Sequence, residues 1–159
     1  MIPILDHLQR QLESARRMLG IVLAQGDAIR RRDVESVLAR LADVQTELVE
    51  RRRLELERDQ LLSRAAGSLG RAADELDLED VLLVAPPAET EAARAASAEL
   101  RGLLLEIGRV HEQNRVLIRQ ELTFLDHLMR VLSGSPQAGY RPGGWANAPQ
   151  SLNVVDARA

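Results

Sequence analysis

Residues 100–132 read LRGLLLEIGRVHEQNRVLIRQELTFLDHLMRVL, and this stretch decides the fold class. Its apolar side chains recur at alternating spacings of three and four residues, the repeat that lines one face of a helix. Because Pro86-Pro87 disfavours an earlier start, the pattern predicts one helix from about Ala88 to Leu132. The positions of this first row are Leu100, Leu103, Ile107, Val110, Asn114, Leu117, Glu121, Phe124, Leu128 and Val131.

A second, mainly apolar row lies beside the first and makes the stripe wider than a two-helix seam requires. Its members are Leu104, His111, Ile118, Leu122, Leu125, Met129 and Leu132. The end from Leu117 to Leu132 is therefore a candidate interaction surface as well as core. Packing of the whole stripe inside a bundle is the simpler interpretation, and both remain open.

Asn114 interrupts the apolar row of this helix. A buried asparagine can set the register between helices at a cost in stability. An exposed one would only mark a break in the stripe. The spacing does not choose between these two interpretations.

Two further long helices precede this one. Leucines and other apolar residues at helical spacing predict a helix from about Pro3 to Arg31 and a second from about Val34 to Ala66. Asp33 is a good N-cap for the second helix, and so short a turn predicts antiparallel packing. The predicted core stripe of the second helix comprises Val34, Val37, Leu38, Leu41, Val44, Leu48, Leu54, Leu61 and Leu62.

The segment between the second and last helices has a less regular pattern. We expect Gly67-Ser68 to interrupt the helix, a short helix over Leu69–Leu76, and a further turn or two from Asp77 to Val84. The fold class predicted is all-α: an antiparallel bundle of three long helices plus a short connector helix. We expect a helical domain over residues 1–133 and a flexible C-terminal tail over residues 134–159.

The tail carries the only tyrosine and the only tryptophan of the chain, Tyr140 and Trp145. Its glycines and prolines make it unsuited to continue a helix. Large aromatic side chains normally anchor a core or an interface. We therefore interpret the tail as a segment for weak, reversible contact with a partner, although exposed aromatics without a function are the simpler alternative.

Composition narrows the function classes. The net charge of −3 argues against nucleic-acid binding, and without lysine or cysteine the chain has no Walker lysine, Schiff-base lysine or thiolate nucleophile. We found no nucleotide-binding, nucleophile-elbow or histidine metal motif, so we expect no catalytic residues, cofactor or metal. The N-terminus lacks a signal-peptide pattern and no segment has the length of a membrane span, so we expect a soluble, cytoplasmic protein.

Two arginine triplets, Arg30-Arg31-Arg32 and Arg51-Arg52-Arg53, suggest nucleic-acid binding at first sight. Acidic residues surround both triplets, and Glu47–Arg51, Arg51–Glu55 and Arg53–Glu57 have the spacing of i,i+4 pairs on a helix. A solvated helix face with internal ion pairs is the better interpretation.

The order of these features resembles the FlgN-type flagellar export chaperones. The resemblance covers most of the chain and is clearest in Asn114-Arg115-Val116-Leu117-Ile118, followed by Leu125, Leu128 and Leu132, then Ser133-Gly134, then Tyr140 and Gly144. It implies a helical chaperone that holds hook-filament junction (hook-associated) proteins in an export-competent state.

The resemblance also implies roles for particular residues. The client's C-terminal helical segment would bind Leu117, Ile118, Leu122, Leu125, Leu128, Met129 and Leu132. Tyr140 would dock at the export-gate platform protein, and Trp145 is a further candidate for partner binding with no family counterpart. A self-associating coiled-coil scaffold is the competing hypothesis, and a homodimer of the free chaperone is also left open.

Overall fold

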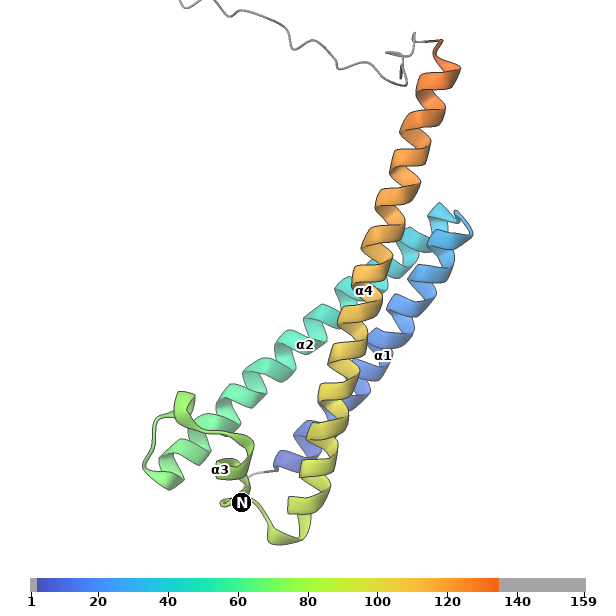
Figure 1. Cartoon of the computed structure of the whole chain (residues 1–159). Helices are drawn as coiled ribbons and strands as arrows, with labels where there is room; N and C mark the ends of the chain where they lie inside the picture. Colours follow the sequence, from blue (N-terminus) through green and yellow to red (C-terminus); the bar gives the residue numbers. More distant parts are fainter. Residues whose placement is uncertain (1–2, 135–159) are drawn as a thin grey trace, which may run out of the picture. The chain divides into compact units, whose positions relative to one another are not determined.

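The computed structural model describes residues 3–134, and within them every regular element is a helix (Figure 1). The long helices are α1 (Ile4–Arg30), α2 (Val34–Leu69) and α4 (Thr90–Leu132). The short helix α3 (Leu78–Leu82) and two 3-10 turns, Ala73–Glu75 and Pro87–Glu89, form the connector. The all-α prediction of three long helices and a short connector helix is confirmed.

The chain divides into two compact units, residues 1–123 and residues 124–159. The first unit contains α1, α2, the connector and most of α4. The last residues of α4 belong to the second unit. The predicted boundary between a domain over 1–133 and a tail over 134–159 stays a prediction, because residues 135–159 lie outside the described part.

A tight turn joins α1 and α2 into the antiparallel hairpin that the sequence predicts (Figure 1). The Asp33 carboxylate accepts hydrogen bonds from the Ser36 backbone N–H (3.0 Å) and hydroxyl (2.6 Å), and so caps α2. Both bonds, the hydroxyl bond first, lower the pKa of Asp33. Arg32 adopts a left-handed backbone conformation (φ 57°), which lets the chain reverse within the three residues between α1 and α2.

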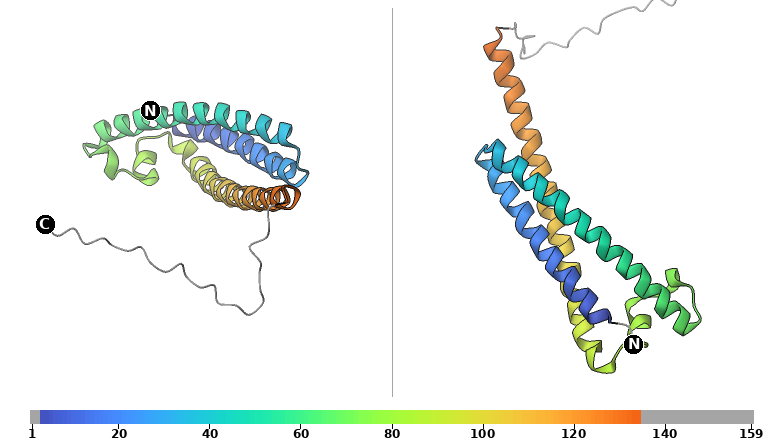
Figure 2. Two further views of the ribbon diagram at one scale, coloured as in Figure 1. Left: turned by 90° about the horizontal axis from the view of Figure 1, so that it is seen from above. Right: turned by 180° about the vertical axis from the view of Figure 1, so that it is seen from behind.

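Helix α1 is the central helix of the first unit, with α2 on one side and the part of α4 before residue 124 on the other (Figure 2). The larger core cluster joins all three helices and the connector, and a smaller one lies further along the bundle. The first comprises Ile4, Leu8, Leu12, Leu61, Ala65, Val81, Leu82, Ala85, Ala93 and Ala96; the second comprises Met18, Val22 and Val110. Alanines on α4 allow close approach to α1.

The connector differs from its predicted layout. Helix α2 continues through Gly67-Ser68 to Leu69 and ends where Gly70 adopts the left-handed C-cap conformation (φ 66°). One exposed glycine costs a helix only about 1 kcal/mol, and burial of the adjacent Ala65 and Ala66 offsets that cost. The predicted helix over Leu69–Leu76 is wrong, since only the 3-10 turn forms there. The predicted turn from Asp77 is confirmed as α3, which begins with a reciprocal Asp77–Asp80 capping box.

The predicted core stripe of α2 is only partly correct. Leu54 and Leu61 are buried, and Val37 and Val44 are half-buried. The remaining apolar residues in the first half of the helix, Val34, Leu38, Leu41 and Leu48, are exposed. The reason is rotational: α2 turns the side with Glu47 toward α1, which leaves the leucine side facing solvent.

Candidate partner-binding surface

The first row of α4 forms the seam with α1 up to residue 121. Val110 and Asn114 are buried, and Leu100, Leu103 and Ile107 pack against the core clusters. Leu117 and Glu121 are half-buried. Two ion pairs add to the contacts of α4 in this seam: Arg16 of α1 with Glu99, and Arg32 of the turn with Glu121 at 2.7 Å. The heptad-like spacing therefore predicted this packing correctly.

The second row of α4 is exposed, together with the end of the first. In the first unit the exposed fraction is 36% for Ile118 and 60% for Leu122, and Leu117 is half-buried. In the second unit the exposed fractions are 51% for Leu125, 40% for Leu128, 65% for Met129 and 74% for Leu132. Phe124 and Val131 are exposed as well. Open apolar area on this scale is the property that a docking surface requires.

Most charges on this stretch of α4 lie away from its apolar side, whereas Glu121 lies among the apolar positions. Arg119, Asp126 and Arg130 fall on the opposite side of a helix with 3.6 residues per turn. Arg130 pairs with Asp126 at 2.7 Å. Glu121 is the acidic residue nearest the apolar row, and Arg32 neutralises it. An apolar helix can therefore approach the row without desolvating an unpaired charge. We name Leu117, Ile118, Leu122, Leu125, Leu128, Met129 and Leu132 the α4 row.

Asn114 is buried, which decides between the two interpretations of its place in the seam. Only 2% of the residue is exposed. Its side-chain N–H groups donate to the Val22 carbonyl at 2.7 Å and the Gln25 side-chain oxygen at 3.4 Å. The Val22 carbonyl thus accepts a hydrogen bond from outside the backbone hydrogen-bond pattern of α1. Because an unpaired buried amide is costly, this contact ties α4 to one position along α1.

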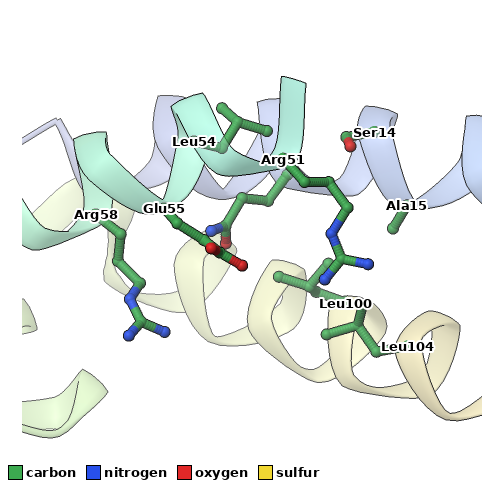
Figure 3. A pocket seen from close by; sticks show the side chains of 9 residues that line it. Ser14, Ala15, Arg51, Leu54, Glu55, Arg58, Leu100 and Leu104 are labelled. Carbon is green, nitrogen blue, oxygen red and sulfur yellow. The ribbon is translucent and has the colours of Figure 1, made fainter. Parts of the chain in front are cut away.

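A groove opens where all three long helices meet (Figure 3). Its volume is about 160 Å³, and Gln11, Ser14 and Ala15 of α1 contribute to its lining. The other lining residues are Arg51, Leu54, Glu55 and Arg58 of α2 and Leu100 and Leu104 of α4. The groove combines leucine side chains with two guanidinium groups and one carboxylate. Sequence reasoning missed it, since its walls come from segments far apart in the chain.

The Glu47 side chain links α2 to α1 through hydrogen bonds. It accepts a hydrogen bond from the Ser14 hydroxyl at 2.5 Å and two from the Arg17 guanidinium at 3.0 and 3.1 Å. Burial alone would raise the pKa of Glu47, but the bonds from Arg17 and Ser14 outweigh it and the pKa is lowered. The predicted Glu47–Arg51 pair is thus replaced by a pair between helices. The predicted Arg53–Glu57 pair is present at 3.9 Å, and Arg53 also bonds Glu50.

A buried histidine lies nearer the start of the hairpin. His7 is 1% exposed, and its Nδ1 lies 3.7 Å from the Glu57 carboxylate. The Arg10 guanidinium forms an ion pair with the Glu57 carboxylate at 2.6 Å. Neither ring nitrogen of His7 has a hydrogen-bond partner among the described residues. Burial, and then the positive charge of Arg10, lower the pKa of His7 below its ordinary 6.5. The lowered pKa favours the neutral imidazole in the folded protein.

This histidine makes stability depend on pH. As pH falls through about 6.5, His7 takes up a proton in the unfolded chain before it does so in the folded one, so the free energy of unfolding should fall. The slope should reach at most about 1.4 kcal/mol per pH unit. Urea titrations between pH 7.5 and 5.5 should show this decrease in the wild type and a flatter profile in His7→Leu. Equal slopes in both would contradict the assignment.

The remaining predicted site residues, Tyr140 and Trp145, lie outside the described residues. Across residues 3–134, no helix has the length and apolar character needed to cross a bilayer. The same residues contain no group of three or more histidine or acidic side chains placed to hold a metal ion.

Comparison with known proteins gives one match. A protein-family model described as "FlgN protein" matches residues 2–148, which is most of the chain. No curated protein and no solved structure matches the chain. The matched range includes all three long helices and the whole of the α4 row.

Proposed function

Because the chain belongs to the FlgN family, a family of flagellar export chaperones, we propose that it acts in the cytoplasm on hook-filament junction proteins. In this proposal it keeps each client from assembling prematurely and delivers it to the export gate. The exposed α4 row is the observation that carries the proposal. A chaperone that releases its client needs an apolar binding surface that is exposed in the free protein.

The chemistry of the α4 row fits an amphipathic client helix. Such a helix lays its apolar side against a complementary apolar surface, with anchors at helical spacing. Ile118, Leu122, Leu125, Met129 and Leu132 supply anchors spaced by three and four residues. We propose that the C-terminal helical segment of the client occupies this row. Covering a client's assembly helix in this way would prevent premature assembly without any ATP-driven step.

We propose a separate role for the segment after residue 134. Tyr140 would dock the loaded chaperone at the export-gate platform protein, and Trp145 would add apolar contact area. Burial of one such aromatic side chain contributes about 2–3 kcal/mol, whereas each residue ordered on binding costs about 1–2 kcal/mol. The balance favours a weak contact, which suits handover of the client.

The decisive experiment is a titration of the purified chain with a hook-filament junction protein from the same flagellar system. We expect a 1:1 complex, lost when the C-terminal helical segment of the client is deleted. Calorimetry gives the affinity, and light scattering gives the mass of the complex. A chain that binds no junction protein but forms a stable self-assembly through the α4 row would support the scaffold hypothesis instead.

Tyr140→Ala separates client binding from delivery. We expect the variant to bind its client with unchanged affinity, because Tyr140 is not part of the α4 row. Secretion of the client should fall, since docking at the export gate would be weakened. Calorimetry and a secretion assay measure the two effects on the same variant. A loss of client affinity would place Tyr140 in the client site and overturn its proposed role.

A further inference from the structure

The first half of α2 carries a second apolar surface that the proposed function does not use. Its larger members are strongly exposed. Their exposed fractions are 68% for Val34, 60% for Leu38, 44% for Leu41, 52% for Leu48 and 73% for Val49. At 3.6 residues per turn these five side chains lie within one side of the helix, with the exposed Ala42 and Gln45 near them. We name this set of seven residues the α2 face.

Apart from Glu35, the charged residues of the same stretch lie on the other side of the helix. Arg40, Asp43, Glu47, Glu50 and Arg51 are buried or half-buried on the opposite side of α2. Glu47 bonds Ser14 and Arg17 of α1, and Arg40 pairs with Asp43. Figure 2 shows α1 along one side of this part of α2. The usual arrangement of a surface helix, apolar inward and charged outward, is thus reversed here.

Two exposed charges of opposite sign flank the α2 face. Glu35 lies near its first residue and Arg52 follows its last, and both are exposed. Within residues 3–134 the neighbouring charges pair with other partners, Arg40 with Asp43 and Arg53 with Glu50. A helix whose apolar face has a negative group at one end and a positive group at the other is complementary to an antiparallel copy of itself.

We propose that the α2 face binds the α2 face of a second copy of this chain, in an antiparallel and twofold-symmetric pair. In this pair, each residue of one copy faces the residue of the second copy whose number brings the sum to 86. Leu38 then lies opposite Leu48 of the second copy, and Leu41 lies opposite its Gln45. Val34 then faces the second copy's Arg52, whose long side chain can reach Glu35. Each contact occurs twice, as in any isologous interface. The small Ala42 lies nearest the twofold axis and permits close approach of the two helices.

This inference goes beyond the proposed chaperone function and uses different residues. No residue of the α4 row takes part in such a dimer. A client helix on the α2 face is the alternative occupant. The matched opposite charges at its two ends favour the second copy, because an antiparallel pair satisfies both at once.

Sedimentation velocity over a wide concentration range tests the proposal on the full chain. We expect a reversible monomer–dimer equilibrium in the wild type. Leu38→Arg with Leu41→Arg should raise the dimer Kd at least about 100-fold, because four leucines lose their apolar contacts. The matched control, Leu83→Arg with Leu105→Arg, adds the same charge at exposed leucines outside both surfaces and should leave the Kd unchanged. Circular dichroism confirms that each variant is folded.

A charge exchange tests the antiparallel register. Glu35→Arg alone or Arg52→Glu alone places like charges together twice and should weaken the dimer about tenfold. The double variant restores opposite charges and should return the Kd to within about threefold of the wild type. A chain that stays monomeric at every concentration, or a dimer insensitive to the Leu38/Leu41 variant or to the charge exchange, would overturn the proposal.

Client titrations of the same variants keep the two proposals apart. We expect Leu38→Arg with Leu41→Arg to bind the client normally. Loss of client affinity in this variant would overturn the dimer proposal and place the client on the α2 face. The chaperone proposal itself fails only if the wild type binds no junction protein.

Discussion

Leu125→Arg combined with Leu128→Arg should abolish client binding, lowering the affinity at least about 100-fold. Burial of one leucine contributes about 1.5–3 kcal/mol, and the variant also requires two guanidinium groups to be desolvated in an apolar interface. Both leucines are exposed in the free protein, so the helix should form as before. Calorimetric titration with the junction protein measures the affinity, and circular dichroism measures the helical content.

The control for this experiment is Leu83→Arg with Leu105→Arg, which adds two arginines at exposed leucines outside the α4 row. Leu105 lies on α4 itself, on the side opposite the row, so it controls for the added charge on the same helix. We expect client binding by this variant to match the wild type. Unchanged affinity in the Leu125/Leu128 variant would show that the client binds elsewhere.

Gly26→Ala should destabilise the fold although alanine is the better helix former. A Cβ atom at Gly26 would lie 2.6 Å from the side-chain oxygen of Asn114. That side chain cannot move freely, because it is buried and donates to the Val22 carbonyl. We expect a loss of about 1–3 kcal/mol in the free energy of unfolding, which is typical of overpacking a core. Urea denaturation measures the change.

Gly20→Ala is the matched control on the same helix. Nothing lies within 4 Å of a Cβ atom placed at Gly20. Helix propensity alone then applies, and the variant should be more stable by up to about 1 kcal/mol. Adding Asn114→Ala to Gly26→Ala should make the cost of the glycine change much smaller than in the wild-type background. Gly26→Ala and Gly20→Ala with equal effects would rule out the close contact.

Much of the local structure follows from the sequence. The three- and four-residue spacing predicted three long helices, and Asp33 predicted the start of α2, because a capping carboxylate acts on backbone groups only three residues away. The α4 seam as far as Glu121 and the Asp77 turn were also predicted correctly. The connector was partly mispredicted because the burial of Ala65 and Ala66 outweighs the weak helix propensity of Gly67.

The tertiary structure alone decided which side of each helix is covered. Periodicity identifies an apolar stripe but not its partner, so the exposed Val34, Leu38, Leu41 and Leu48 were predicted as core. The burial of Asn114 against Gly26 and the Glu47 bonds to Ser14 and Arg17 join residues from different helices. The physical reason is that helix formation depends on nearby residues, whereas the rotation of a helix in a bundle depends on contacts distant in the chain. The sequence therefore determined the helices, and packing around α1 determined which apolar surfaces stay open for partners.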